Sequence, residues 1–423
     1  MTAARFAGSG PLRGRLALPG DKSISHRALI FGALAEGRSR VRGLSTGDDV
    51  ARTRAALEAC GIRVEDEVVH GGRRRFTEPE RPLDVGNSGT AMRLLAGVLA
   101  TFDFLSVLVG DDSVHRRPMD RVSAPLREMG ALVDGRQGGR LAPLVVRGGR
   151  LVGVDHAPAV PSAQVKGALL LAGLAAEGRT TVRERFATRP HTEELLELCG
   201  HPAAVRDEGD VHVVSVGPGE LAPFELDVPG DPSQAAFLAV AASIVAGSEV
   251  LLENVYVGPG RAGFLAVLER MGASIDRRPR SATAADLLVR SAPLSATEIE
   301  AAEVPDCIDE LPVLAVAAAF ADGTTTVRGA SELRVKESDR IETMARALRS
   351  FGVRVETFED GMAVTGGSVR PRGRVDAAAD HRVAMALAVA ALAGSDPVEI
   401  DGFEAVATSW PSFVDDVGGL LCS

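Results

Sequence analysis

The sequence is poor in aromatic residues and in cysteine. Only one Trp and one Tyr occur among 423 residues, so we expect a core of Ala, Leu and Val side chains with closely packed helices. No CxxC pair and no histidine at ligand spacing accompanies the four isolated cysteines, Cys60, Cys199, Cys307 and Cys422. This pattern predicts buried thiols in a reducing compartment and no zinc site.

Long apolar runs and an excess of positive charge are also absent. The longest runs, near 235–246 and 383–393, fall short of the ~20 residues that cross a bilayer. The first residues lack the apolar stretch of a signal peptide. A net charge of −10 argues against non-specific binding to nucleic acid and to anionic membranes. We therefore expect a cytoplasmic protein with small-molecule ligands, and a local basic pocket is not excluded.

The sequence does contain a sixfold repeat. Each copy has Asp, Ser or Asn at the start of an Ala- and Leu-rich helix that ends at Gly and leads into a β-type segment. The copies begin at Asp21, Gly86, Pro161, Gly230, Ile308 and Asp380. Because their spacing exceeds the ~20–50 residues of most repeat arrays, we predict small α/β modules.

A second repeated element, a helix that ends at Gly before a short alternating strand, lies between the first ones. It occurs at 56–65, 125–134, 265–276 and 346–356, with a looser copy at 195–205. Each module is thus predicted as helix–strand–helix–strand, with further strands at 141–149 and 362–367. Six modules exceed one core, so we predict two domains of three modules, divided near Gly230. A lone strand before Asp21 could belong to either domain.

The first helix of each module is apolar almost all round, as in 235–246, which is typical of a buried helix. The polar residues therefore gather at the helix starts. A helix N-terminus offers free N–H groups and the positive end of a dipole. Six such ends directed at one place would bind an anion strongly.

In the first half, cations lie where a helix dipole disfavours them. Lys22, Ser23 and Arg27 fall in the first turns of the helix that follows Asp21. We interpret them as groups that face an anionic ligand, and a solvated surface pair is the alternative. The GDKS string lacks the GxxxxGK[ST] spacing, which excludes a P-loop.

The Gly-rich turn at 86–93 is suited to close approach of the backbone to a phosphate or carboxylate. The string VHRRPMDR holds Arg116, Arg117 and Arg121, for which an exposed basic loop is the alternative.

Two further segments, 161–167 and 187–194, add hydroxyls, an amide, Lys166 and Arg189. That inventory fits hydrogen bonds to a phosphorylated, hydroxylated ring.

The second half adds carboxylates. Asp309 precedes a nearly all-apolar helix, where it could cap the helix or serve as a partly desolvated general base. On a helix, Lys336, Glu337 and Arg340 would share one face, and a solvated ion-pair face is the usual meaning of such a string. Arg382 is again a cation at a helix start. We predict two domains that clamp a strongly anionic ligand or ligand pair, with carboxylates available for proton transfer.

Seven strings carry a resemblance: LPGDKSISHRA, GNSGTAMR, RRPMDR, SAQVKGALLLAGL, GDPSQAAF, RVKESDRI and DHRVAMA. In their order and spacing the chain resembles the EPSP synthase (3-phosphoshikimate 1-carboxyvinyltransferase) family over essentially its whole length. The resemblance implies the α/β enolpyruvyl transferase fold, in which each of two domains repeats a βαβαββ unit three times around buried parallel helices. It assigns 1–20 and 229–423 to a domain on the side of phosphoenolpyruvate and the catalytic carboxylates. It assigns 21–228 to an inserted domain on the side of shikimate 3-phosphate.

The implied reaction transfers the carboxyvinyl group of phosphoenolpyruvate to the 5-hydroxyl of shikimate 3-phosphate and releases phosphate. It belongs to the shikimate pathway to chorismate and the aromatic amino acids. No metal or organic cofactor is expected, because arginines and helix ends supply the positive charge. We expect a monomer, with neither nucleic acid nor membrane as a partner.

The resemblance also implies residue roles. Catalysis is implied for Lys22, Asp309 and Glu337, and which of them handles which proton stays open. Shikimate 3-phosphate would contact Lys22, Ser23, Arg27, Ser162, Ala163, Gln164, Asp309, Lys336 and either Arg189 or Thr188. Phosphoenolpyruvate would contact Lys22, Asn87, Gly89, Thr90, Arg117, Gln164, Arg340 and Arg382.

One departure and three alternatives accompany the resemblance. Some family members carry a lysine near the C-terminus where this chain has Thr408 and Ser409. Gly89 leaves room in the phosphoenolpyruvate pocket, so we predict inhibition by glyphosate. Enzymes that act on a UDP-sugar are the nearest alternative, but their catalytic-loop cysteine has no counterpart in SVHRRPMDR. The second alternative is a transferase that acts on the hydroxyl of a secondary metabolite. The third is a non-catalytic anion-binding module.

Overall fold

A computed structural model describes residues 3–367 and 369–421, and the chain divides into two compact units. Unit 1 comprises Met1–Asp21 and Pro229–Ser423, and unit 2 comprises Lys22–Val228. Cys422 lies outside the described residues, whereas the other three cysteines are buried and free, as predicted. Burial raises the pKa of the Cys60 and Cys199 thiols to about 12.

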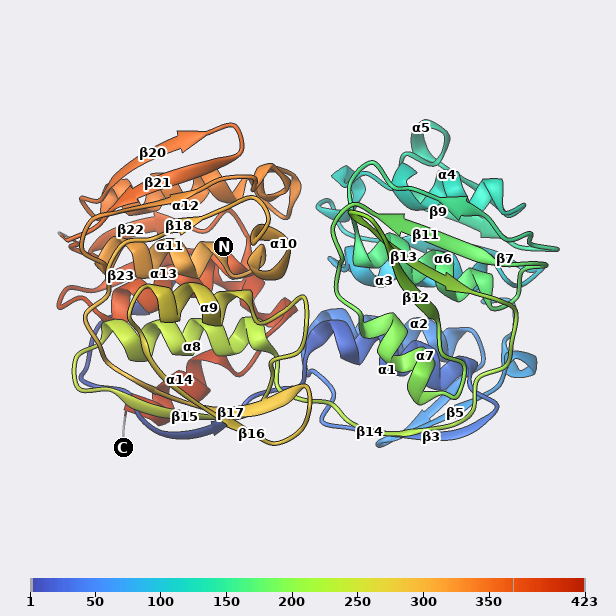
Figure 1. The fold of residues 1–423 in the computed structure, drawn as a ribbon, viewed down its shortest axis with the longest axis horizontal. Helices are drawn as coiled ribbons and strands as arrows, with labels where there is room; N and C mark the ends of the chain where they lie inside the picture. Colours follow the sequence, from blue (N-terminus) through green and yellow to red (C-terminus); the bar gives the residue numbers. More distant parts are fainter. Residues whose placement is uncertain (1–2, 368, 422–423) are drawn as a thin grey trace. The chain divides into compact units, whose positions relative to one another are not determined.

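Unit 2 repeats one module three times (Figure 1). Its main helices are α1 (Lys22–Leu34), α2 (Asp48–Ala59), α3 (Gly89–Leu99), α4 (Asp120–Glu128), α6 (Ala163–Gly173) and α7 (His191–Leu198). Short turns of helix are η1 (Arg73–Arg75), η2 (Val114–Arg116) and α5 (Arg136–Gly139). The strands are β3 (Gly37–Arg42), β4 (Arg63–Glu65), β5 (Val68–Gly71), β6 (Leu83–Asp84), β7 (Leu105–Val109), β8 (Leu132–Gly135), β9 (Leu141–Arg147), β10 (Asp155–His156), β11 (Thr180–Glu184), β12 (Ala204–Glu208), β13 (Val211–Val216) and β14 (Glu225–Asp227). They form sheets of order β14-β3-β5-β4, β6-β7-β9-β8 and β10-β11-β13-β12.

Unit 1 follows the same plan. Its helices are α8 (Pro232–Ile244), α9 (Gly263–Arg270), α10 (Val304–Cys307), α11 (Leu311–Phe320), η3 (Ser331–Val335), α12 (Arg340–Ser350), α13 (His381–Leu392), η4 (Phe403–Thr408) and α14 (Phe413–Leu421). The strands are β1 (Ala4–Phe6), β2 (Arg13–Ala17), β15 (Glu249–Tyr256), β16 (Ser274–Pro279), β17 (Ala284–Arg290), β18 (Glu298–Ile299), β19 (Thr324–Val327), β20 (Arg354–Phe358), β21 (Gly361–Thr365), β22 (Gly373–Asp376) and β23 (Val398–Asp401). The sheet orders are β16-β17-β15-β2, β18-β19-β21-β20 and β1-β23-β22.

The four-stranded sheets share one register, that of the predicted βαβαββ unit, although in two of them the first strand (β14 or β2) comes from a distant part of the chain. In one of them, β6 pairs parallel with β7 across α3, and β9 then pairs antiparallel with both β7 and β8. The three-stranded sheet keeps the parallel pair β22 and β23, and β1 from the other end of the chain pairs antiparallel with β23. The α/β fold class and its threefold repeat are confirmed.

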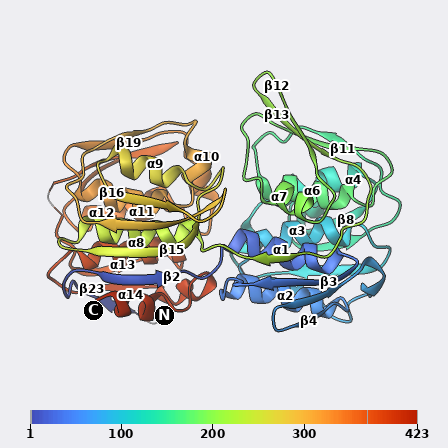
Figure 2. The ribbon, with the colours of Figure 1, turned by 60° about the horizontal axis from the view of Figure 1, so that its bottom comes forward.

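Two strands pair outside their order in the sequence. The strand before Asp21, which the sequence left open, is β2, and it pairs parallel with β15 in unit 1 (Figure 2). β14 pairs parallel with β3 in unit 2. Where the chain passes between the units, Gly20 and Gly230 form a β-bridge.

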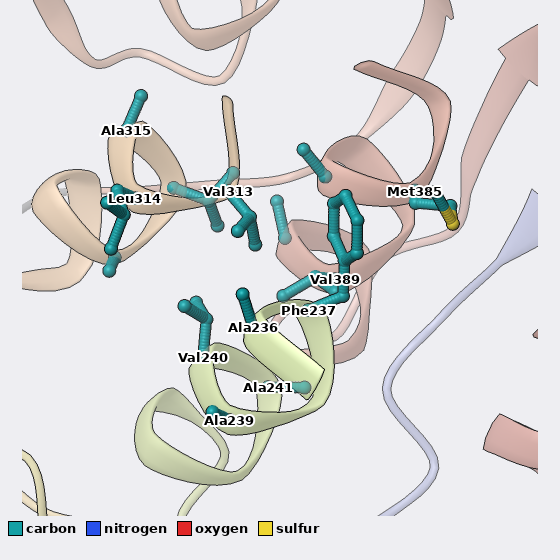
Figure 3. Packing of buried hydrophobic residues seen from close by; sticks show 14 of the residues in the cluster. Ala236, Phe237, Ala239, Val240, Ala241, Val313, Leu314, Ala315, Met385 and Val389 are labelled. Atoms are coloured by element: carbon teal, nitrogen blue, oxygen red, sulfur yellow. The ribbon is translucent and has the colours of Figure 1, made fainter. Parts of the chain in front are cut away.

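The core of unit 1 lies among α8, α11 and α13, which contact one another. Nearly all residues of these helices are buried. Figure 3 shows Ala236, Val240, Val313 and Val389 turned toward the space that the three helices share. Small side chains let the helices approach closely, and the scarcity of aromatic residues follows from this packing.

In unit 2, α3 and α6 pack against each other in the same way. A Cβ added at Gly97 would lie 2.3 Å from the carbonyl oxygen of Ala168, so the contact requires glycine.

All six predicted helix starts are present, at α1, α3, α6, α8, α11 and α13. The RVKESDR segment is not one helix, so the shared helix face considered for Lys336, Glu337 and Arg340 does not form. Asp339 accepts a hydrogen bond from the backbone of Glu342 at 3.1 Å, so α12 begins only at Arg340. Lys336 and Glu337 therefore lie in a turn between η3 and α12 and cannot share a helix face with Arg340. Within the described ranges, no helix is long and apolar enough to cross a membrane.

Candidate active site

The predicted residues of unit 2 form one group, here called the unit 2 cluster: Lys22, Ser23, Arg27, Asn87, Gly89, Thr90, Arg117, Ser162, Ala163, Gln164 and Arg189. Most of them lie in the first turns of α1, α3 and α6 or just before them, and Arg117 and Arg189 come from the segments before α4 and α7. Ser88 and Ser162 cap α3 and α6, because their Oγ atoms accept hydrogen bonds from Ala91 and Val165.

Arg27 connects two of these helix starts. Its Nη1 donates to the carbonyl of Ser23 and its Nη2 to that of Ala163, both at 3.0 Å, while Nε donates to Thr192 at 2.9 Å. Arg27 is only 2% exposed, so the alternative of a solvated surface arginine is wrong. Nearby, Lys22 Nζ lies 3.0 Å from Asp49 Oδ2 at the start of α2.

Arg117 and Arg93 hold the Gly-rich turn. Arg117 Nη2 donates to Asn87 Oδ1 at 2.7 Å, and its Nη1 donates to the Asn87 carbonyl at 3.3 Å. Arg93 Nη1 donates to Gln164 Oε1 at 2.6 Å and to the Gly89 carbonyl at 3.3 Å. A Cβ at Gly89 would lie 3.0 Å from the Nη1 atoms of both arginines. The turn thus presents two guanidinium groups around a position without a side chain.

Gln164 bridges the starts of α6 and α3, since its Nε2 also donates to Thr90 Oγ1 at 2.8 Å. Arg189 approaches from the loop before α7, with Nη1 3.4 Å from Ser23 Oγ.

Lys166, which the sequence grouped with the ligand-binding residues, is fully buried. Its Nζ pairs with Glu184 at 2.9 Å and Glu193 at 2.7 Å, and it donates to the carbonyl of Thr188 at 3.2 Å. Lys166 therefore fixes the loop that carries Arg189 and presents no charge at the surface.

The predicted residues of unit 1 form the unit 1 cluster: Asp309, Lys336, Glu337, Arg340 and Arg382. Asp309 is its centre. Its carboxylate lies 3.5 Å from Arg340, 3.7 Å from Arg382 and 4.0 Å from Lys336. The alternative in which Asp309 caps α11 is wrong, because Glu310 occupies the cap position and makes no side-chain cap bond.

Arg340 is the most tightly held cation of this cluster. Its Nε donates to Asp380 at 2.8 Å and its Nη2 to Glu337 at 2.5 Å. Burial disfavours the charged form, but Asp380, Glu337 and Asp309 outweigh it and raise the pKa of Arg340 above its ordinary value. Arg382 Nη1 donates to the carbonyl of Asp309 at 3.0 Å.

Lys336 has the opposite shift. Desolvation lowers its pKa below the ordinary 10.5, Arg340 lowers it further, and the carboxylate of Asp309 only partly offsets this. Its ammonium group is therefore easier to deprotonate than that of an exposed lysine.

Sequence reasoning missed two arginines. Arg93 belongs to the quoted string GNSGTAMR, and its place one helical turn after Gly89 was the available signal. Arg261 lies in a Gly-rich loop before α9 and is buried beside Asp309; no spacing or repeat marks it. Ser409, where the sequence departs from the pattern that the resemblance implies, is buried, and its carbonyl accepts from Gln234 at 3.0 Å.

Among residues 3–367 and 369–421, no group of three or more His, Cys, Asp or Glu side chains is arranged to hold a metal ion. The absence of a cofactor stays a prediction. The residues present can bind anions through the unit 2 cluster, and they place a carboxylate among cations in the unit 1 cluster.

Comparison with known proteins connects these clusters to one family. The family model of EPSP synthase (3-phosphoshikimate 1-carboxyvinyltransferase) matches residues 6–417. A 3-phosphoshikimate 1-carboxyvinyltransferase of Alkalilimnicola ehrlichii is 50% identical over 97% of this chain and 93% of its own length. One of Anaeromyxobacter is 49% identical over 97% and 96%.

Solved structures agree. The EPSP synthase of Acinetobacter baumannii superposes with a TM-score of 0.87 at 38% identity, over 99% of this chain and 98% of that one. An enolpyruvyl transferase of Streptomyces tendae has a TM-score of 0.79 at 19% identity, over 99% and 97%, and shows the shared fold alone. The chain therefore belongs to the EPSP synthase (3-phosphoshikimate 1-carboxyvinyltransferase) family and is a transferase.

Proposed function

We propose that the protein transfers the carboxyvinyl group of phosphoenolpyruvate to the 5-hydroxyl of shikimate 3-phosphate, with release of phosphate. The observation that carries the proposal is the Asp309 carboxylate within 4.0 Å of Lys336, Arg340 and Arg382. A carboxylate among cations can accept a proton from a hydroxyl beside bound anions. The transfer reaction belongs to the shikimate pathway, which leads to chorismate and the aromatic amino acids.

The chemistry needs two proton transfers. The acceptor hydroxyl loses its proton as its oxygen bonds to the central carbon of the enolpyruvyl group, and the methylene carbon gains a proton to become a methyl group. The tetrahedral intermediate then loses phosphate and a methyl proton, which restores the double bond. Asp309 is proposed as the base for the hydroxyl, and Glu337 and Lys22 as the groups that exchange protons with the carbon.

The acceptor is proposed to contact residues of both clusters: Lys22, Ser23, Arg27, Ser162, Ala163, Gln164, Arg189, Asp309 and Lys336. The contacts of Arg27 refine its role. Three of its donors already bind Thr192 and the carbonyls of Ser23 and Ala163, so Arg27 supports the acceptor site chiefly by joining the starts of α1 and α6.

Phosphoenolpyruvate is proposed to contact Lys22, Asn87, Gly89, Arg117, Gln164, Arg340 and Arg382. Guanidinium groups suit a ligand with a carboxylate and a phosphate, because each can donate two parallel hydrogen bonds. One reaction thus draws on residues of both units, and no metal is needed to balance the charge of the substrates.

The test is release of inorganic phosphate from phosphoenolpyruvate in the presence of shikimate 3-phosphate. We expect turnover only when both substrates are present. A UDP-sugar and shikimate without its phosphate serve as matched acceptors. Turnover with the UDP-sugar alone would identify a different transferase, and no release with any acceptor would leave an anion-binding module. The monomeric state, the cytoplasmic location and inhibition by glyphosate stay predictions.

A further inference from the structure

Arg261 is a buried arginine outside the residues proposed to bind substrate. It is 2% exposed, and its Nη2 donates to Asp21 at 2.9 Å and Asp231 at 2.8 Å. These carboxylates lie in the two segments where the chain passes between the units. Burial disfavours the charge of Arg261, but the surrounding carboxylates outweigh it and raise the pKa above its ordinary value. Arg261 is therefore a permanent cation.

The other arm of this guanidinium faces the unit 1 cluster. Nη1 lies 3.9 Å from Asp309 Oδ2 and 3.8 Å from Glu310 Oε1. Neither Nη1 nor Nε has a hydrogen-bond partner within the part of the chain that the structure describes. An unpaired buried donor is unfavourable, so a small movement of either carboxylate toward Nη1 would be stabilised.

Arg261 differs from the other cations around Asp309. Lys336, Arg340 and Arg382 are proposed to bind anionic substrates, and their attraction for Asp309 is then shared with those anions. Arg261 is buried, as Arg340 is, and its Nη2 is held by Asp21 and Asp231, but unlike Arg340 it is not among the residues proposed to contact a substrate. Its charge near Asp309 stays the same whether or not the site is occupied.

We propose that Arg261 is a positioning residue for the reaction, which keeps the Asp309 carboxylate charged and oriented while the neighbouring cations bind substrate. This inference rests on the proposed function, with Asp309 as base. The groups that face Asp309 include Arg261, Lys336, Arg340 and Arg382, with Glu310 adjacent in the chain. Glu337 contacts Arg340 and so affects Asp309 indirectly. A purely structural role, joining the two crossing segments, is served by Nη2 alone.

The variant Arg261→Lys separates the two roles. A single ammonium can keep the contact with Asp21 and Asp231, but it removes the second nitrogen that faces Asp309. We expect the acid limb of the pH profile of kcat, which reports the substrate-bound enzyme, to move to higher pH by about one unit. We expect kcat near neutral pH to fall about tenfold, with both KM values within about twofold.

The matched control is Arg349→Lys. Arg349, in the last turn of α12, donates to the carbonyl of Val355 and pairs with Glu342 of the first turn, and it is not part of the unit 1 cluster. Its substitution should leave the pH profile unchanged.

A second variant keeps the test independent of how well Arg261→Lys folds. Arg261→Met combined with Asp231→Asn removes one charge of each sign, and Asn can still cap α8. The acid limb of the double variant should move to higher pH by at least as much as that of Arg261→Lys. Asp231→Asn alone should not move the acid limb to higher pH. An unmoved acid limb in folded variants would overturn the proposal. So would failure of both Arg261 variants to fold, which would mark a structural role only.

Failure of the inference is distinguishable from failure of the proposed function. If Asp309→Asn retains wild-type turnover, Asp309 is not the base and the proposed mechanism fails. If Asp309→Asn is inactive while the Arg261 variants keep the wild-type acid limb, only the inference about Arg261 fails.

Discussion

The two clusters use their cations differently. In the unit 2 cluster, Arg27 binds backbone carbonyls and Arg117 binds the neutral amide of Asn87. In the unit 1 cluster, Arg340 binds the carboxylates of Asp380 and Glu337. Lys22 in the unit 2 cluster does pair with Asp49, but the carboxylates proposed to exchange protons, Asp309 and Glu337, both lie in the unit 1 cluster beside Arg340. We infer that unit 2 mainly binds anions and that unit 1 mainly positions groups that exchange protons.

The substitution Asp309→Asn tests this contrast with the largest expected effect. It removes the charge but keeps the shape, so we expect kcat to fall by about 10²–10⁴, the range of general base catalysis. The measurement is phosphate release at saturating substrates. A fall of less than about threefold would break the contrast, because unit 1 would then bind without catalysing.

Arg27→Ala should have the next largest effect, this time on binding. Loss of the link between α1 and α6 should raise KM for shikimate 3-phosphate about tenfold or more, with a smaller change in kcat. Steady-state kinetics measures both values, and the thermal unfolding midpoint checks the fold. An unchanged KM in a folded variant contradicts the role given to Arg27.

The lowered pKa of Lys336 predicts a pH dependence. Because its folded-state pKa lies below 10.5, the ammonium is lost at a lower pH than in an ordinary lysine, and KM for the anionic acceptor should rise as pH approaches 10.5 from below. The same shift means that the charged form of Lys336 opposes folding, a cost that is full below the folded-state pKa and disappears as pH rises from that pKa to the ordinary value of 10.5. Lys336→Arg, which stays charged, should keep KM flat over that range. If KM for the acceptor depends on pH in the same way in the wild type and in Lys336→Arg, Lys336 does not bind the acceptor.

Gly89→Ala should have the smallest effect on turnover. The new methyl group would lie 3.0 Å from the Nη1 atoms of Arg93 and Arg117, and the ends of these side chains can shift by a few tenths of an ångström. We expect KM for phosphoenolpyruvate to rise about threefold and inhibition by glyphosate to weaken more. If glyphosate inhibits the wild type and Gly89→Ala equally, Gly89 does not lie in the phosphoenolpyruvate site as proposed.

The fold was predictable because its signals are local. Ala- and Leu-rich stretches bounded by Asp or Ser and by Gly define the six buried helices, and the repeat itself predicts three modules per domain. The turn at Lys336 and Glu337 was missed, although Asp339 and Glu342 have the spacing of a capping box. Attention to that spacing would have placed the helix start at Arg340.

The site was predictable only in part. Lys22, Asn87, Asp309 and Arg382 lie at helix starts, where a dipole argument finds them. The burial of Arg27 and Lys166 depends on partners far along the chain, such as Thr192 and Glu184, which no local pattern specifies. Arg261 is the extreme case, because all its partners come from other segments.

Binding of shikimate 3-phosphate to Asp309→Asn, measured by titration calorimetry beside the wild type, tests the division of roles most directly. We predict a Kd within about threefold of the wild-type value in a variant that no longer turns over. A Kd weakened as much as turnover would contradict it, because Asp309 would then serve binding instead of proton transfer.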